Sequence, residues 1–267
     1  MQKAFADAAG VIHPPAMIAP RIVCLVPSIT ELLCDLGLSP ALVGRTGFCI
    51  HPKEVLRKVP KVGGTKDVDL DKVRALAPSH VIVNVDENRQ ETAIALAEFV
   101  PHVVVTHPLS PTDNLDLFRL IGHLFGVAAE AERLCAELES VLEVPKDALP
   151  HRRVLYLIWK DPWMTVSRDT YISRMLAHVN WWTEPVEAAL RYPQVELPRI
   201  AQGIDEILLS SEPYPFQARH VADIQALCGT DRVRLIDGEM VSWYGSRAIQ
   251  GLRYLDAFRQ DAEETRT

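Results

Sequence analysis

The chain of 267 residues is long enough to form two lobes of ordinary size, each around its own hydrophobic core. Its 28 basic and 35 acidic side chains give a net charge of −7 at neutral pH. That balance argues against nucleic acids and anionic membrane surfaces as partners, because both attract positively charged proteins. No apolar run approaches the roughly 20 residues that span a bilayer.

The N-terminal 20 residues contain no continuous apolar segment like that of a secretory signal, because Asp7, His13 and the Pro14-Pro15 pair interrupt it. The five cysteines are odd in number and show no CxxC spacing, so reduced, structural thiols are expected. Taken alone, these observations predict a cytoplasmic protein.

The first predicted elements lie in VCLVPSITELLCDLG, residues 23–37. The spacing predicts a strand, a tight turn and a helix, with Ser28 as N-cap, Glu31 as its capping-box partner and Gly37 at the C-terminus. Ser28 at a strand's carboxyl end has three interpretations: a nucleophile, part of an anion site, or a helix cap. The GxSxG pattern of hydrolases is missing, so the cap is favoured.

Further along, short apolar runs alternate with helical patterns. This alternation predicts an α/β fold with two parallel-sheet lobes, one over residues 21–109 and the other over 152–260. The predicted strands cover 80–84, 102–106, 154–159, 207–211 and 232–236, and predicted helices include 89–99, 170–179 and 246–258.

Between the lobes, Ser110-Pro111-Thr112-Asp113 is a strong helix start. Apolar or small residues then recur every three or four positions from Leu117 to Leu142. The pattern predicts one backbone helix within 110–145, starting near Thr112 and ending near Val144, of about 30 residues and roughly 45 Å. Such a stripe is compatible with a coiled coil, but the flanking α/β units favour a spine that packs along its own protein.

No sequence motif indicates catalysis. The nine histidines form no HExxH or HxH pattern, no GK[ST] follows Gly63-Gly64-Thr65, and no GxGxxG follows a strand. We therefore expect no catalytic residue, no metal site and no covalent cofactor. Aromatic side chains instead gather in the inter-element loops of the second half, together with arginines. Such rings either seal the core or provide a platform for a large ligand that is partly apolar and partly anionic.

Four segments together resemble the helical-backbone metal-chelate receptors, the substrate-binding proteins of cobalamin and ferric-siderophore uptake by ABC transporters. They are RIVCLVPSITELLCDLGL, KVGGTKDVDLDKVRALAPSHVIV, YPQVELPRIAQGIDEILLS and SWYGSRAIQGLRYL. The resemblance extends over nearly all of residues 21–258 and is nearest to the cobalamin receptors. It implies the class III binding-protein architecture, two lobes joined by one long helix, and capture of a ligand in the cleft between them.

The resemblance also implies a set of ligand-binding residues. At Gly64 and Thr65 the chain lacks a ring that the family carries, which weakens the case for cobalamin itself and leaves another corrinoid or a siderophore. The implied ligand-binding residues are Ser28, Phe48, Trp163, Arg168, Tyr192, Trp243, Tyr244 and Arg247.

Receptors of this kind dock on a permease through one surface acid on each lobe. Asp71 matches the first acid, whereas the second falls at Pro198 with Glu196 nearby. The resemblance thus implies a monomeric, non-enzymatic, periplasmic receptor for a metal chelate, with a permease as its partner. The alternative is a cytoplasmic cofactor carrier or an enzyme of the same fold that acts on a tetrapyrrole-like cofactor.

Overall fold

A computed structural model describes residues 5–16, 19–143 and 149–264, and in it the chain divides into two compact units. Unit 1 comprises the chain up to Pro108 together with Thr112–Leu138 and Tyr244–Arg247. Unit 2 comprises Leu109–Pro111, Glu139–Trp243 and the chain from Ala248 onward. Unit 1 is therefore built from both halves of the sequence.

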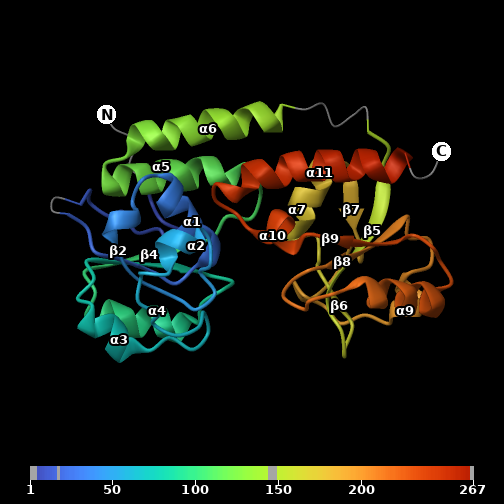
Figure 1. The fold of residues 1–267 in the computed structure, drawn as a ribbon, viewed down its shortest axis with the longest axis horizontal. Coiled ribbons are helices and arrows are strands. Elements are labelled where there is room, and N and C mark those ends of the chain that lie inside the picture. Colours follow the sequence, from blue (N-terminus) through green and yellow to red (C-terminus); the bar gives the residue numbers. More distant parts are fainter. Residues whose placement is uncertain (1–4, 17–18, 144–148, 265–267) are drawn as a thin grey trace. The chain divides into compact units, whose positions relative to one another are not determined.

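The sheet of unit 1 contains four parallel strands in the order β2-β1-β3-β4 (Figure 1). The central strands are apolar runs that are buried along their whole length, as is typical of a parallel sheet covered on both faces. Strands β3 and β4 match the predicted ranges, and His80 pairs with His102 where both begin. The bounds are β1 Ile22–Cys24, β2 Leu42–Arg45, β3 His80–Asn84 and β4 His102–Thr106.

The shorter helices of unit 1 follow the strands. Asp69 caps α3, and its carboxylate accepts a hydrogen bond from the Lys72 N–H at 3.0 Å. The predicted Ser28 cap is wrong, because Pro27 occupies the first helical position and places Ser28 inside α1. These helices are α1 Pro27–Asp35, α2 Lys53–Leu56, α3 Leu70–Ala75 and α4 Gln90–Ala97, with a 3₁₀ turn at Ser39–Ala41.

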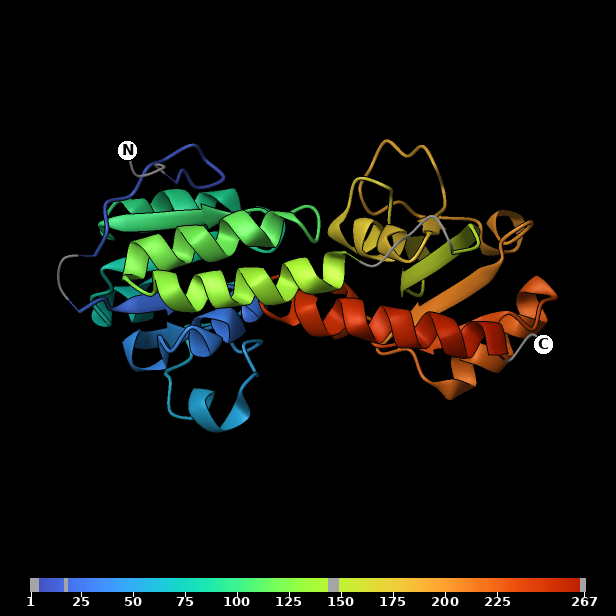
Figure 2. The same ribbon diagram turned by 90° about the horizontal axis from the view of Figure 1, so that it is seen from above.

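The segment predicted as one backbone helix forms two helices, α5 Asp113–Phe125 and α6 Ala128–Leu142, which lie side by side (Figures 1 and 2). Gly126 ends α5 with φ +71°, a left-handed conformation that a continuing helix cannot accommodate. The two helices run antiparallel, since Arg119 of α5 binds Glu132 of α6 at 2.8 Å. The predicted end near Val144 lies outside the described residues.

The sheet of unit 2 has the strand order β6-β5-β8-β9, with β7 also paired to β5. Only β6 is antiparallel, and the other pairings are parallel. Residues of β5, β8, α8 and α9 form a buried apolar cluster against one face of the sheet. The bounds are β5 Arg152–Trp159, β6 Met164–Thr165, β7 Trp181–Thr183, β8 Glu206–Ser210 and β9 Val233–Ile236.

The helices of unit 2 are α7 Tyr171–His178, α8 Leu197–Ile200, α9 Ala218–Cys228, α10 Gly238–Ser242 and α11 Arg247–Glu264. Helix α11 begins at Arg247 of unit 1 and continues as part of unit 2. No helix in the described parts of the chain is long and apolar enough to cross a bilayer. The predicted fold class, two α/β lobes with parallel sheets, is confirmed.

Candidate functional site

The four strands of unit 1 are parallel, so the loops that follow them meet at one edge of the sheet. We call the loops 46–51, 63–68 and 85–88 the unit 1 strand-end surface. Phe48 is 61% exposed and Val85 is 51% exposed, and Ile50 is exposed as well. Three large apolar side chains thus stand in water on the loops at this edge of the sheet.

The side chain of Asn88 ties these loops together. Its amide N–H group donates to the carbonyl oxygens of Leu25 at 3.3 Å and Thr65 at 3.0 Å. Its Oδ1 accepts from the Asn84 N–H at 2.8 Å, and Asn88 itself is buried. Nearby, Lys66 Nζ donates to the Asp86 carbonyl at 2.8 Å. Hydrogen bonds within the protein thus hold these loops together.

Below Phe48, a buried arginine fixes the loop after β2. Arg45 donates to the carbonyl oxygens of Leu56 at 2.9 Å, Thr46 at 3.0 Å and Cys49 at 3.0 Å. Burial raises the pKa of the Cys49 thiol, so Cys49 is a neutral packing residue here. Phe48 is therefore an exposed ring on a braced loop, as a stacking platform requires.

Two of the predicted ligand-binding residues are occupied within unit 1. Ser28 is buried in the first turn of α1. Arg247 forms two hydrogen bonds with the Glu31 carboxylate, at 2.7 and 2.6 Å, and both side chains are largely buried. Glu31 therefore pairs with Arg247, and the predicted capping box does not form, since α1 has Val26 as its N-cap.

The adjacent aromatic residues Trp243 and Tyr244 are also buried, with exposed fractions of 8% and 7%. In unit 2, Trp243 Nε1 donates to Glu212 Oε1 at 3.0 Å. In unit 1, the Tyr244 hydroxyl donates to the Glu87 carboxylate. Burial and the neighbouring Glu87 raise the pKa of Tyr244, so its hydroxyl remains a donor. Their burial favours the alternative that these rings serve packing.

In unit 2 the loops 159–163 and 211–216 form the corresponding unit 2 strand-end surface. Trp159, the last residue of β5, is 40% exposed and packs edge-to-face on Tyr214 at 5.7 Å between ring centroids. Trp163 stacks on Phe216 at 6.3 Å, and Lys160 Nζ lies 5.8 Å from the Trp163 ring. Trp159 was absent from the predicted site, although its place at a strand's carboxyl end signalled it.

Arg168 and Tyr192 are also in unit 2. Arg168 Nε donates to the Thr183 carbonyl at 3.2 Å, and its guanidinium lies 5.5 Å from the Trp182 ring. Trp182 and Thr183 pair with the first residues of β5, whereas Trp159 is its last residue. Tyr192 is exposed on the loop that hydrogen-bonds with residues 163–167. These contacts place Tyr192 beside the segment that carries Trp163, and Arg168 beside Trp182.

The predicted docking acids are both at the surface. Asp71 is exposed in the first turn of α3, and Glu196 is exposed immediately before α8. Each therefore stands at the start of a short helix, one in each unit.

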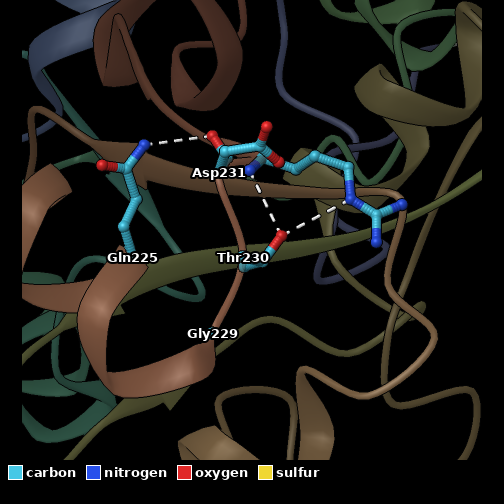
Figure 3. Close-up of a pocket in the computed structure, with 5 residues that line it drawn as sticks. Gln225, Gly229, Thr230 and Asp231 are labelled. Atoms are coloured by element: carbon cyan, nitrogen blue, oxygen red, sulfur yellow. Dashed lines mark hydrogen bonds between the residues drawn. The ribbon is translucent and has the colours of Figure 1, made fainter.

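A separate pocket of about 490 Å³ lies at the end of α9 (Figure 3). Gln225 Nε2 donates to the Asp231 carbonyl at 3.1 Å, and Thr230 Oγ1 accepts from the Arg232 N–H at 3.2 Å. This pocket precedes β9, at the sheet edge opposite the aromatic loops, and has no aromatic lining. Among the described residues, no three His, Cys, Asp or Glu side chains are grouped to hold a metal ion.

Residues 22–181 match the sequence family described as "Periplasmic binding protein", and this match covers more than half of the chain. The chain belongs to that family. A curated relative, the uncharacterized ABC transporter substrate-binding lipoprotein YvrC of Bacillus subtilis, is 29% identical over 169 residues. That alignment covers 58% of this chain and 52% of the relative, so the chain spans about half the length of the curated relative it matches.

Solved structures show the same fold. The periplasmic vitamin B12 binding protein BtuF of Vibrio cholerae has a TM-score of 0.78 and 16% identity, over 91% of this chain and 98% of that one. The periplasmic heme-binding protein RhuT from Roseiflexus sp. RS-1 has a TM-score of 0.75 and 22% identity, over 87% and 95%. These similarities establish the architecture, and the predicted class III arrangement of lobes agrees with them.

Proposed function

We propose that this protein is the substrate-binding component of an ABC transporter and captures a metal chelate of the corrinoid, heme or siderophore class. The observation that carries the proposal is the exposed aromatic and apolar side chains on both strand-end surfaces, Phe48 and Val85 in unit 1 and Trp159 in unit 2. The family membership and the names of the similar proteins, which bind vitamin B12 or heme, support it.

The physical basis is burial of an apolar macrocycle against rings. Aromatic contacts contribute about 0.5–1.5 kcal/mol beyond the area that they bury. Lys160, near the Trp163 ring, would meet a carboxylate or phosphate group of such a ligand. Binding of this kind needs no catalytic group, so the proposed role is capture and release of the intact chelate.

A ligand panel tests the proposal. Cyanocobalamin, hemin and a ferric siderophore are titrated into the purified protein, with absorbance and calorimetry as readouts. Phe48→Ala and Trp159→Ala are expected to weaken binding about tenfold each, near 1.4 kcal/mol, because each removes an exposed ring. Ile94→Ala, at an exposed apolar position of α4, is the matched control and should leave affinity unchanged. Failure of all three probes to bind wild type would reject the chelate class.

We further propose that the protein works outside the cytoplasm and docks on a permease through Asp71 and Glu196. The family description and the lipoprotein relative support this location over the cytoplasmic expectation. Asp71→Lys and Glu196→Lys should each lower the ATPase activity that the receptor elicits from its transporter several-fold, with ligand affinity unchanged. An equal effect from Glu98→Lys, another exposed acid of unit 1, would show that only net charge matters.

A further inference from the structure

Two neighbouring aromatic residues each bind a carboxylate on a strand-end loop of their own unit. The chain passes from unit 2 to unit 1 between Trp243 and Tyr244. Trp243 donates its indole N–H to Glu212, in the loop after β8, at 3.0 Å. Tyr244 donates its hydroxyl to Glu87, in the loop after β3. Both loops follow strands that lie inside their sheets.

In unit 1 the loop that Tyr244 holds is the one that organises the strand-end surface. Glu87 stands directly before Asn88, whose side chain links the loops at Leu25, Thr65 and Asn84. Val85, exposed on the same loop, is part of the proposed ligand face. A change in the position of Glu87 would therefore also displace the proposed ligand face, because the two are only a few residues apart on the same loop.

In unit 2 the loop after β8 is equally constrained. Glu212 Oε1 accepts from Ser242 Oγ at 2.6 Å as well as from Trp243. A Cβ on Gly238, at the start of α10, would lie only 2.5 Å from Ser210 Oγ and 2.6 Å from Glu212 Cγ, so the loop packs directly on that turn. Burial raises the pKa of Glu212, and its two donors oppose that shift. The same loop carries Tyr214, the ring against which Trp159 packs.

The backbone around Tyr244 is itself fixed to unit 1. The Gly245 N–H donates to Asn114 Oδ1 at 2.6 Å, and Asn114 is buried in α5. Gly245 has φ +80°, and a Cβ there would lie 3.3 Å from both Leu32 Cβ and the Ser28 carbonyl. Together with the Arg247–Glu31 pair, these contacts hold the Tyr244 side chain at a defined place in unit 1.

We infer that Tyr244 and Trp243 are positioning residues, which act through Glu87 and Glu212 to hold the two ligand-facing loops in order before a ligand arrives. This inference rests on the proposed function for its purpose, but the contacts themselves do not depend on any ligand. These contacts favour binding by preorganisation, because a loop that is already ordered loses less conformational freedom when the ligand is captured.

Hydrogen exchange of the ligand-free protein, followed by mass spectrometry, tests the inference directly. Tyr244→Phe should speed exchange in peptides covering 84–89 about tenfold and leave 211–216 unchanged, because one hydrogen bond to a partly buried carboxylate is lost. Trp243→Phe should speed exchange in peptides covering 211–216 and leave 84–89 unchanged. If Trp243→Phe does not fold, Ser242→Ala removes the second donor to the same carboxylate.

Tyr254→Phe and Trp182→Phe are the matched controls. Each removes a hydroxyl or an indole N–H that has a hydrogen-bond partner elsewhere in unit 2, at Asp237 and Asn180. Both should leave exchange at 84–89 and 211–216 unchanged. Uniformly faster exchange throughout a unit, or no change in either loop, would overturn the inference.

Affinity for cyanocobalamin and hemin provides the second readout. If either probe binds wild type, Tyr244→Phe should weaken it about three- to tenfold, in step with the faster exchange at 84–89. Weaker binding with unchanged exchange would make Tyr244 a direct ligand contact and overturn the positioning role. If neither probe nor the ferric siderophore binds, the chelate proposal fails, and the exchange experiment still decides whether the loops are held in this way.

Discussion

Three histidines gather where β3 and β4 begin. The rings of His80 and His102 stack at 4.7 Å between centroids, and His13 lies edge-on to His102 at 5.8 Å. His13 also binds the buried Asp7 carboxylate at 3.0 Å, which anchors the N-terminal segment beside β4. Burial, with help from His102 and His13, lowers the pKa of His80 to about 4. Burial and His13 also lower the pKa of His102.

This cluster predicts a loss of stability in mild acid. Between pH 6.5 and about 4 the unfolded chain binds a proton at His80 that the folded protein does not, so the free energy of unfolding falls as the pH falls. Urea unfolding at about pH 7 and pH 5 measures how much the free energy of unfolding changes with pH. His80→Gln should reduce this pH dependence, whereas His151→Gln, at an exposed histidine, should not. Parallel slopes for wild type and His80→Gln would contradict the prediction.

Residue roles set by local sequence were predictable, and roles set by distant partners were not. Asp69 caps α3 because the cap and its N–H group lie three residues apart. Glu31 has the spacing of a capping box, yet it binds Arg247, which is 216 residues away. Trp243 and Tyr244 have the composition of ligand platforms, but Glu212 and Glu87 fix them inside their units. A single sequence contains no signal for such long-range pairs.

At the scale of elements, the α5–α6 hairpin depends on one small residue at its contact. A Cβ on Gly122 would lie 2.6 Å from the Ala131 Cβ and 3.3 Å from the Ala128 Cα. The apolar stripe predicted one helix because its period continues through the turn at Gly126. Local pattern shows which face is buried, but it does not show whether a helix continues or folds back on itself.

Gly122→Ala should therefore destabilise the protein, although alanine favours helices. The added methyl group must push α6 away from α5, and overpacking of this kind costs about 1–3 kcal/mol. Thermal or urea unfolding measures the change. Gly47→Ala is the matched control, since its Cβ would lie at an ordinary 3.7 Å from the Gly63 carbonyl oxygen. A Gly122→Ala protein as stable as wild type would show that the two helices separate at no cost.

For strands too, local sequence pattern decided which elements could be predicted. The uninterrupted β-branched runs at 80–84 and 102–106 were predicted with their observed bounds. Strand β2, Leu42–Arg45, was not predicted, because it is short and contains Gly44. That glycine is required by tertiary packing, as its Cβ would lie 2.7 Å from Leu76 Cδ1.

At the scale of the whole molecule, unit 1 is completed by four residues from near the end of the chain, Tyr244–Arg247. Their contacts reach α1 through Glu31, α5 through Asn114 and the loop after β3 through Glu87. The two-lobed class was predictable because alternating strands and helices repeat in both halves. The contribution of Tyr244–Arg247 to unit 1 was not predictable, because it depends on contacts between residues more than 100 positions apart.

Arg247→Met should accordingly destabilise unit 1 by about 3 kcal/mol, since it leaves the largely buried Glu31 carboxylate without its arginine. The double variant Glu31→Gln with Arg247→Met should recover part of the loss. Arg133→Met, which breaks an exposed pair with Glu137, should change the free energy of unfolding by less than about 0.5 kcal/mol. Urea unfolding compares the three variants, and equal effects at Arg247 and Arg133 would refute the role of the buried pair.

The late position of Tyr244–Arg247 has a consequence for how the protein is made. Domains of a growing chain begin to fold as they leave the ribosome, at about 5–20 residues per second. Here Glu31, Glu87 and Asn114 are synthesised early, and their partners emerge more than 100 residues later. Throughout that interval unit 1 lacks part of its native structure. The nascent unit 1 therefore cannot complete its fold until Tyr244–Arg247 have emerged, more than 100 residues after the partners of these residues.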